Sequence, residues 1–505
     1  MVAVPQFSFA LWLCVTSTLI PLVEGWGDAG TTKNCSVRWM TQFLNNFGWE
    51  NETWQQRLFI YDKHYRQGGP LLFYTGNEAN IELFVNNTGW MWAHAPELSA
   101  ALIFAEHRFF GMSIPVQCGG SSVDATLQRC GGFLSSQQAM ADYARVITML
   151  SEEYNTTKVV TVGGSYGGML AAWMRMQYPA LVIGALASSA PIGCIDPTYR
   201  PQSYWAQVTK DATLAGGNPV PECETVLSKA TQQMRELEKS PTTRAQLWKL
   251  LGLCGSPPTG GDDAFGPYGP DGAAATLVQS AFDAMAMGSY PFPSAFMSGT
   301  LQHPAPPWPF HVACRRAVDV LSTFVNRSSP VALMSALRAA VGVVRNTSQS
   351  VACFDATAAV SRSWRTWDFM VCTEAAIHEQ PFFAARGPPN DMFWEQPVFN
   401  HSVWNAWCRH QFWGLSPRWG PLSWTLGREA VYQSSNIVFV NGMLDPWHTG
   451  GILANGTLGR DLIAYLIPDA GHHLDLFYPS AADSDAVCRI RRAQVSFVKK
   501  WCSLR

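Results

Sequence analysis

A serine in a short glycine-rich segment is the residue of this chain best suited to covalent chemistry. Ser165 lies in Gly163-Gly164-Ser165-Tyr166-Gly167, a Gly-x-Ser-x-Gly pattern between a β-prone run at 159–162 and a helix-forming segment. This strand–turn–helix context is typical of a nucleophile elbow, whose tight turn exposes the serine hydroxyl above a sheet. Side chains at Gly163 and Gly167 would collide with the neighbouring strand and helix. The pattern predicts Ser165 as a nucleophile and the backbone N–H of Tyr166 as an oxyanion donor.

Two later segments offer partners for this serine. Asp445 follows an apolar run at 436–440, and His472 follows another at 462–467. The order Ser, Asp, His is the order of α/β-hydrolases, in which each residue follows a core strand. A serine hydroxyl needs an imidazole to accept its proton, and a carboxylate holds the imidazole in the productive tautomer.

Each partner alone has an ordinary structural explanation, since an aspartate before proline starts turns and histidines are common in loops. Both follow predicted strands in the required order, so we expect Ser165, Asp445 and His472 to form a triad. We favour His472 over the neighbouring His473 because it directly follows Gly471 at the strand end.

The elements that position these residues predict an α/β-hydrolase core with a large insertion. Residues 181–191 are a further buried strand, whereas the segments 223–253 and 331–344 have helical spacing. The length and the hydrophobic content of 47% allow a large core and more than one domain. The predicted domains are a hydrolase core over 26–193 and 425–505 and a mostly helical lid over 194–424 that limits substrate entry.

The N-terminus has the features of a secretory signal. An apolar segment is followed by small residues, so we expect residues 1–25 to be a signal peptide cleaved after Gly25. An uncleaved anchor is the alternative, although Pro21 and the short span disfavour it. We expect a secretory protein without a transmembrane anchor.

Cysteine and asparagine patterns agree with this route. Removal of Cys14 leaves an even number of cysteines, which predicts disulfides, with Cys118–Cys130 and Cys488–Cys502 suggested by their spacing. Zinc is disfavoured, because Cys-x-x-Cys and His-Glu-x-x-His are absent from the sequence. A net charge of −2 offers no basic patch for nucleic acid. Eight sequons predict glycosylation, at Asn34, Asn51, Asn86, Asn155, Asn326, Asn346, Asn400 and Asn455.

Motifs along most of the chain resemble those of the S28 serine peptidases, the family of lysosomal Pro-X carboxypeptidase, dipeptidyl peptidase II and thymus-specific serine protease. These motifs are the segments 73–78, 104–111, 134–139, 163–170, 290–294, 372–374, 413–419, 441–451 and 471–476. The resemblance implies a serine exopeptidase that cleaves beside proline with the triad above, a helical lid, and lysosomal or endosomal residence or secretion. Two positions depart from the family. Phe477 stands where an arginine is usual, which bears on an accessory proton relay through His473, and Met370 replaces a glutamine near the substrate.

The end of the peptide that is cleaved depends on the anchor that the chain provides. A dipeptidyl peptidase must pair a free ammonium with a carboxylate, and a carboxypeptidase must hold a carboxylate with a cation or backbone N–H groups. Glu78, Glu106 and Glu374 suit the first, and Arg108 or a Gly-rich loop suits the second, although Glu106 and Arg108 could equally pair with each other or hold loops. The segment 170–173 is slightly more similar to Pro-X carboxypeptidase. We therefore expect a Pro-X carboxypeptidase-like enzyme, with a dipeptidyl peptidase II-like enzyme as the alternative.

The segment after the first predicted strand is expected to contribute to the site. Hydrolases of this fold supply a second oxyanion donor there, which predicts the backbone of Gly76, or that of Asn77 and Glu78, as that donor. Asn77 and Glu78 follow Gly76 directly and are expected to contact substrate. Glu374 and Trp447 complete the predicted substrate-binding set, and aromatic residues that could line a proline pocket are Trp447, Trp173 and Tyr166.

Two further classes of function compete with the peptidase. A secreted esterase or lipase could use the same core, since fold does not fix substrate, and an inactive binding protein would be signalled by a missing triad residue. All three triad residues are present. We expect proline-containing peptides as substrates, a homodimer as the assembly, no nucleic-acid partner, and no metal or organic cofactor.

Overall fold

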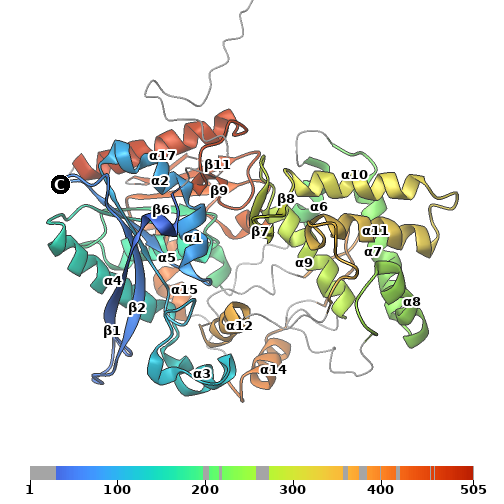
Figure 1. Ribbon diagram of the computed structural model, residues 1–505, viewed down its shortest axis with the longest axis horizontal. Coiled ribbons are helices and arrows are strands. Elements are labelled where there is room, and N and C mark those ends of the chain that lie inside the picture. Colours follow the sequence, from blue (N-terminus) through green and yellow to red (C-terminus); the bar gives the residue numbers. More distant parts are fainter. Residues whose placement is uncertain are drawn as a thin grey trace, which may run out of the picture.

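The central element is a single nine-stranded sheet with the order β1-β2-β4-β3-β5-β6-β9-β11-β10 (Figure 1). The computed structural model describes residues 30–196, 204–214, 219–257, 272–356, 362–374, 384–397, 400–416, 421–454, 456–459 and 461–503. Strands β4, β3, β5, β6, β9 and β11 are parallel neighbours, and β1, β2 and β10 pair antiparallel at the two edges. This topology confirms the α/β-hydrolase core.

The strand bounds are β1 (Ser36–Phe43), β2 (Thr53–Tyr61), β3 (Leu71–Thr75), β4 (Ala101–Ala105), β5 (Val159–Gly164), β6 (Gly184–Ser188), β9 (Ile437–Gly442), β10 (Gly456–Gly459) and β11 (Leu462–Ile467). The inner strands are buried on both faces, and alternate side chains enter two separate cores. In β3, Leu71 and Phe73 join one hydrophobic cluster, whereas Leu72 and Tyr74 join the other.

Helices cover both faces of the sheet. Helices α4 (Ser136–Glu153) and α5 (Tyr166–Gln177) supply the first cluster, which includes Tyr143 and Trp173. Helices α1 (Ile81–Asn87), α2 (Gly89–Leu98) and α17 (Asp485–Ser503) supply the second, which includes Trp90 and Trp501. The short α3 (Val123–Cys130) precedes α4.

The chain between β6 and β9 is mostly helical, and its first helices stand beside the sheet as a separate group in Figure 1. That group holds α6 (Tyr204–Leu214), α7 (Cys223–Glu238), α8 (Pro241–Leu251), α9 (Ala273–Met287), α10 (Pro309–Ser322), α11 (Pro330–Arg345) and the hairpin β7 (Ser294–Gly299) with β8 (Pro304–Ala305). Helices α12 (Arg362–Glu374), α14 (His401–Gln411), α15 (Pro421–Leu426) and α16 (Arg428–Tyr432) complete the segment. The exact limits of the lid stay a prediction, and the predicted signal peptide over 1–25 lies outside the described residues.

The disulfides confirm one predicted pair and correct another. Cys118 is bonded to Cys130, as predicted, but Cys502 has a free thiol, so the prediction of Cys488–Cys502 is wrong. Both cysteines lie on α17, where their spacing along the helix is about 21 Å, and a disulfide needs Cα atoms within about 7 Å. Three further disulfides lie in the inserted segment, namely Cys223–Cys314, Cys254–Cys353 and Cys372–Cys408.

Two further observations agree with a secretory protein. The sequon residues Asn34, Asn51, Asn155, Asn326 and Asn400 are exposed. Four disulfides within the described residues are typical of a protein from an oxidising compartment. Within the described ranges, no helix is both long enough and apolar enough to span a bilayer.

Candidate active site

Ser165 occupies a strained turn between β5 and α5. Its φ of 59° and ψ of −130° place a non-glycine residue in a region that side chains disfavour. The turn is tight, since a Cβ on Gly163 would lie 2.1 Å from the carbonyl oxygen of Gly167. A Cβ on Gly167 would lie 2.8 Å from the carbonyl oxygen of Thr75. These contacts explain both glycines of the pattern.

Asp445 and His472 form a buried pair. His472 Nδ1 lies 2.7 Å from Asp445 Oδ2, and the other carboxylate oxygen accepts the backbone N–H of Trp447 at 3.0 Å. Asp445 follows β9 and caps the short 3-10 helix Pro446–Gly450, which fixes the direction of its side chain. A carboxylate held in this way keeps the imidazole proton on Nδ1 and leaves Nε2 to act as a base.

The neighbouring histidine has different surroundings. The ring of His473 stacks on Phe477 and meets Phe296 edge to face. Burial, and secondarily the charge of His472, lowers the pKa of His473 well below its usual range. His473 is therefore a neutral, packed side chain, and the geometry favours His472 as the base. Phe477, which replaces the usual arginine, supplies an apolar wall at this position.

The loops that carry the three residues meet at one edge of the sheet. Strands β5, β6, β9 and β11 are parallel neighbours, so their carboxyl ends align. The N–H of Ser165 donates to the carbonyl oxygen of Ser188 at 3.0 Å. The N–H of His473 donates to Ser189 Oγ at 2.9 Å. The end of β6 thus holds both the serine turn and the histidine loop.

The two predicted oxyanion donors, the backbone N–H groups of Tyr166 and Gly76, differ in their surroundings. The N–H of Tyr166 begins α5, where the helix dipole favours negative charge. The N–H of Gly76 donates instead to the carbonyl oxygen of Ala105 at 3.1 Å, continuing the β3–β4 ladder. Gly76 is therefore committed to the sheet, and the backbone of Asn77 and Glu78 is the remaining candidate for the second donor.

Glu78 carries an unpartnered carboxylate oxygen. Within the described part of the chain, its buried Oε2 has no hydrogen-bond partner, and neither does Asn77 Oδ1. Burial raises the pKa of Glu78, against hydrogen bonds from its own backbone and from Asn77 and the charge of His472. A buried polar atom without a partner is costly, and near a nucleophile it points to a ligand.

Glu374 contacts the hydrolase core rather than an open pocket. Its Oε1 accepts the backbone N–H of Ser136 at 2.8 Å, and its Oε2 lies 2.8 Å from Ser136 Oγ. Ser136 Oγ is also 2.9 Å from the hydroxyl of Tyr166, which lies 3.2 Å from His107 Nε2. Burial raises the pKa of Glu374 to about 7. The predicted contact of Glu374 with substrate stays a prediction.

The inserted helices place aromatic and acidic groups beside Asp445. The partly buried ring of Trp447 packs edge to face on Tyr204 of α6, with ring centres 5.4 Å apart. The Tyr204 hydroxyl donates to Asp283 of α9. Burial, with a smaller contribution from the charge of Asp445, raises the pKa of Asp283 to about 6. Sequence reasoning missed Asp283, because nothing in the sequence links α9 to the aspartate loop.

Trp173 does not line a pocket. Its buried indole N–H donates to the carbonyl oxygen of Leu426 at 2.9 Å, so the ring joins α5 to α15. The ring of Tyr166 is also buried, packed against Trp367 of α12. Of the three aromatic candidates, Trp447 keeps exposure beside the triad.

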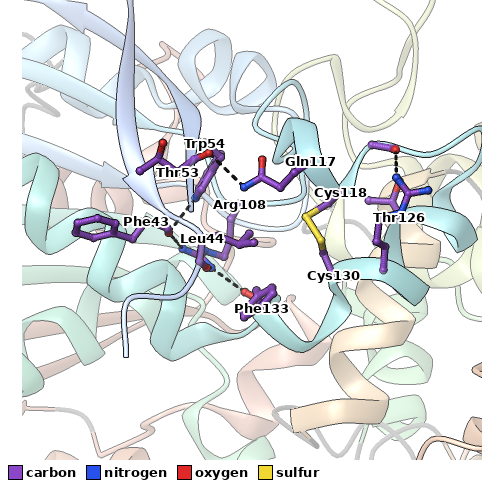
Figure 2. The surroundings of a disulfide bond; sticks show 12 residues. Phe43, Leu44, Thr53, Trp54, Arg108, Gln117, Cys118, Thr126, Cys130 and Phe133 are labelled. Carbon is purple, nitrogen blue, oxygen red and sulfur yellow. Dashed lines mark hydrogen bonds between the residues drawn. A yellow bond between two sulfur atoms is a disulfide. The ribbon is translucent and has the colours of Figure 1, made fainter. Parts of the chain in front are cut away.

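Arg108 and Glu106 hold loops and are not substrate anchors. Arg108 is fully buried and pairs with Asp142 through two contacts of 2.7 Å. Its guanidinium also donates to the carbonyl oxygens of Leu44 and Phe133, as Figure 2 shows. Glu106 is likewise fully buried and pairs with Arg57 at 2.7 Å. Both residues therefore hold loops, which was one of the predicted alternatives. They do not pair with each other, because Arg108 pairs with Asp142 and Glu106 pairs with Arg57.

Comparison with known proteins identifies the family. The family model described as serine carboxypeptidase S28 matches residues 42–494. The chain belongs to this S28 family. It is 35% identical over 485 residues to lysosomal Pro-X carboxypeptidase of Mus musculus, covering 94% of this chain and 90% of the relative. The identity to the human protein of that name is also 35%, over 93% and 88% of the two chains.

A more distant S28 relative is the thymus-specific serine protease of Mus musculus. It is 28% identical and covers 91% of this chain and 86% of its own length. Membership in the S28 family makes this protein a serine-type peptidase. The four disulfides described above fit a peptidase of the secretory pathway.

Proposed function

We propose that this S28 peptidase removes the C-terminal residue of peptides in which proline is the penultimate residue. The observation that carries the proposal is the 2.7 Å Asp445–His472 pair beside the strained Ser165 turn, in a chain similar to Pro-X carboxypeptidases over nine-tenths of its length. The triad residues are Ser165, Asp445 and His472. The substrates are proline-containing peptides, and a homodimer remains part of the proposal.

The proposed mechanism is acyl transfer. Ser165 Oγ attacks the carbonyl carbon of proline while His472 Nε2 takes its proton, and Asp445 stabilises the imidazolium. The oxyanion accepts hydrogen bonds from the N–H of Tyr166 and from the backbone at 77–78. His472 then returns the proton to the leaving amine, and water repeats the sequence to release the acid. Trp447 supplies a flat face for the proline ring.

Glu78 is a candidate to bind the C-terminal carboxylate of the peptide, because Arg108 is buried and paired with Asp142. As a neutral acid, Glu78 can donate a hydrogen bond from its unpartnered Oε2 to a substrate carboxylate. Its raised pKa favours this neutral form in acid. Ionised, the same group would pair with a substrate ammonium, so the unpartnered Oε2 also supports a dipeptidyl peptidase II-like activity as the second candidate.

The charge state of buried acids supports an acidic compartment of the secretory pathway. Burial raises the pKa of Asp283 to about 6, and it raises the pKa values of Asp368 and Glu374 to about 7. These groups bind protons more tightly in the folded chain than in the unfolded chain, so acid favours folding. We therefore propose lysosomal or endosomal residence in preference to the extracellular medium.

The test compares two substrates with purified protein and with Ser165→Ala, from acidic to neutral pH. An N-blocked peptide ending in Pro-Phe reports carboxypeptidase activity, and a free-amino Xaa-Pro fluorophore reports dipeptidyl peptidase activity. We expect cleavage of the first peptide alone, and none by the variant. Cleavage of the second alone would replace the proposal with the dipeptidyl peptidase, and hydrolysis of acyl esters alone would favour an esterase.

A further inference from the structure

A continuous line of polar contacts joins the inserted helix α12 to the residue after the nucleophile. It runs from Glu374 through Ser136 and Tyr166 to His107, with separations of 2.8, 2.9 and 3.2 Å. It ends where His107 Nδ1 lies 2.7 Å from the carbonyl oxygen of Arg108. Since a carbonyl oxygen only accepts, His107 Nδ1 carries a proton. Burial lowers the pKa of His107 to about 3, so its Nε2 is an acceptor.

The number of protons decides whether every contact in this line is a hydrogen bond. With a neutral Glu374, the carboxyl proton is donated to Ser136 Oγ, and the Ser136 hydroxyl donates to Tyr166. The Tyr166 hydroxyl then donates to His107 Nε2. The second carboxyl oxygen still accepts the Ser136 N–H. Every donor in the line has one acceptor, and every contact is satisfied.

Ionisation removes one proton and leaves one contact unmade. The Ser136 hydroxyl must then donate to the carboxylate of Glu374, so the single proton of Tyr166 can serve only Ser136 or His107. The contact that is left brings two lone pairs together in a buried site, which is unfavourable. Tyr166 is the residue affected, because it is the member of the line with two acceptors and one proton.

We propose that Glu374 is a positioning residue, which in its neutral form completes this line and holds Tyr166 so that its backbone N–H points at the oxyanion. The inference rests on the proposed function of the Ser165 site. Glu374 touches no reacting atom and acts through Ser136 and Tyr166. Through this line of contacts, α12 of the inserted segment is connected to Tyr166 in the nucleophile turn.

Burial is the main cause of the raised pKa of Glu374, and the hydrogen bonds of Ser136 oppose it. In the described ranges, the groups that shift its pKa besides burial are the N–H and hydroxyl of Ser136. The charge of Glu374 in turn raises the pKa of Tyr166, although burial of Tyr166 is the larger cause. On the neighbouring α3, Asp124 pairs with Arg365, near the other end of α12. The basic side chains of α14, which are His401, Arg409 and His410, are not among the causes of the shift.

The test is the pH profile of peptide hydrolysis by the full-length protein and Glu374→Gln. A glutamine can donate from Nε2 to Ser136 Oγ and accept from the Ser136 N–H, so it copies the neutral acid and cannot ionise. We expect kcat of the wild type to fall by up to tenfold per pH unit above about 7. We expect Glu374→Gln to lose this decline while its KM stays within about twofold of the wild type. Glu236→Gln, on the exposed surface of α7, is the matched control and should keep the wild-type profile.

Two further variants test the same line of contacts if Glu374→Gln folds poorly. Ser136→Ala and Tyr166→Phe break the line at all pH values, so each should lower kcat in acid and flatten the alkaline decline. An unchanged alkaline decline in Glu374→Gln, or in both other variants, would overturn the proposal. Failure of the function itself has another signature, because the wild type would then cleave neither peptide at any pH, or no faster than Ser165→Ala.

Discussion

The ring of His473 lies directly against Gly164, the residue before the nucleophile. A Cβ on Gly164 would stand 2.8 Å from two ring carbons of His473. The ring cannot easily move aside, because Phe477 and Phe296 pack on it. The second histidine therefore acts as a spacer, which sets the distance between the serine turn and the loop that carries His472.

Gly164→Ala is expected to displace this loop. The added methyl group overpacks the contact, and we expect a loss of about 1–3 kcal/mol in the free energy of unfolding with a decrease in kcat. Urea denaturation and steady-state kinetics measure the two effects. Gly132→Ala, where a Cβ would meet nothing within 4 Å, is the control and should change neither. Wild-type behaviour of Gly164→Ala would show that the loop is more pliable than its packing implies.

Ser165→Ala is expected to abolish hydrolysis without unfolding the protein. Removal of Oγ deletes the nucleophile, and kcat should fall by at least about 10³-fold. The thermal midpoint should stay close to that of the wild type, since Ser165 makes its structural contacts through backbone atoms. Residual activity near the wild-type value would exclude the serine mechanism.

Asp445→Asn is expected to lower kcat by about 10³- to 10⁴-fold with little change in KM. The amide can donate toward His472 Nδ1, which favours the tautomer that cannot accept the serine proton. The decrease is measured with the peptide substrate at the pH of maximal activity. His473→Asn should leave kcat within about tenfold, and a larger loss in that variant than in His472→Asn would reverse the assignment of the two histidines.

Glu78 variants distinguish the two ends of the peptide. If Glu78 donates to a substrate carboxylate, Glu78→Gln keeps a donor and a nearly unchanged KM, whereas Glu78→Ala raises KM about tenfold. If Glu78 pairs with an ammonium, both variants lose cleavage of the Xaa-Pro substrate. The measurement is KM for peptides ending in a carboxylate and in a carboxamide. Equal KM values for both peptides in the wild type would remove Glu78 as the anchor.

Arg108→Met is expected to destabilise the fold by about 3–5 kcal/mol, because it leaves the fully buried Asp142 without its partner. Chemical denaturation measures the loss. The matched control is Arg38→Met, which removes an exposed ion pair with Glu153 and should cost less than about 1 kcal/mol. A raised KM without destabilisation would restore Arg108 as a substrate anchor.

Folding stability is expected to fall as pH rises from about 4 to about 7. Glu374 and Asp368 have native pKa values of about 7, above the values of about 4 in an unfolded chain. Their contribution is complete below the unfolded pKa and is lost as pH rises through the native pKa. Thermal midpoints across this range measure the trend, and Glu374→Gln should reduce it. A midpoint that rises over the same interval would contradict the raised values.

The strands could be predicted from the sequence because each is a buried apolar run. Residues that follow neighbouring parallel strands are expected at one edge of the sheet, and the pairing of Asp445 with His472 agrees with this reasoning, whereas the catalytic triad itself stays a prediction. Local spacing failed for Cys488 and Cys502, since it ignored the continuous helix between them. It also failed for Gly76, whose N–H continues a ladder that no motif indicates.

Contacts between distant helices were beyond sequence reasoning. Ser136 and Glu374 are 238 residues apart, and their pairing depends on how α12 lies over the start of α4. The motifs marked both residues, but a motif gives no partner. No sequence motif indicated Asp283, because an aspartate in an amphipathic helix is usually solvated. Its contact with Tyr204 depends on how α6 and α9 pack in the folded chain.

The pairing of β6 with β9 has a consequence for synthesis of the chain. Ala185 pairs with Ile437, so some 250 residues must be synthesised after β6 before its neighbour β9 can pair with it. At about 5–20 residues per second this delay is roughly 12–50 s. Asp445 and His472 come later still, so a nascent chain carries a nucleophile without a base. We therefore expect the nascent protease to be inactive while its inserted helices are made.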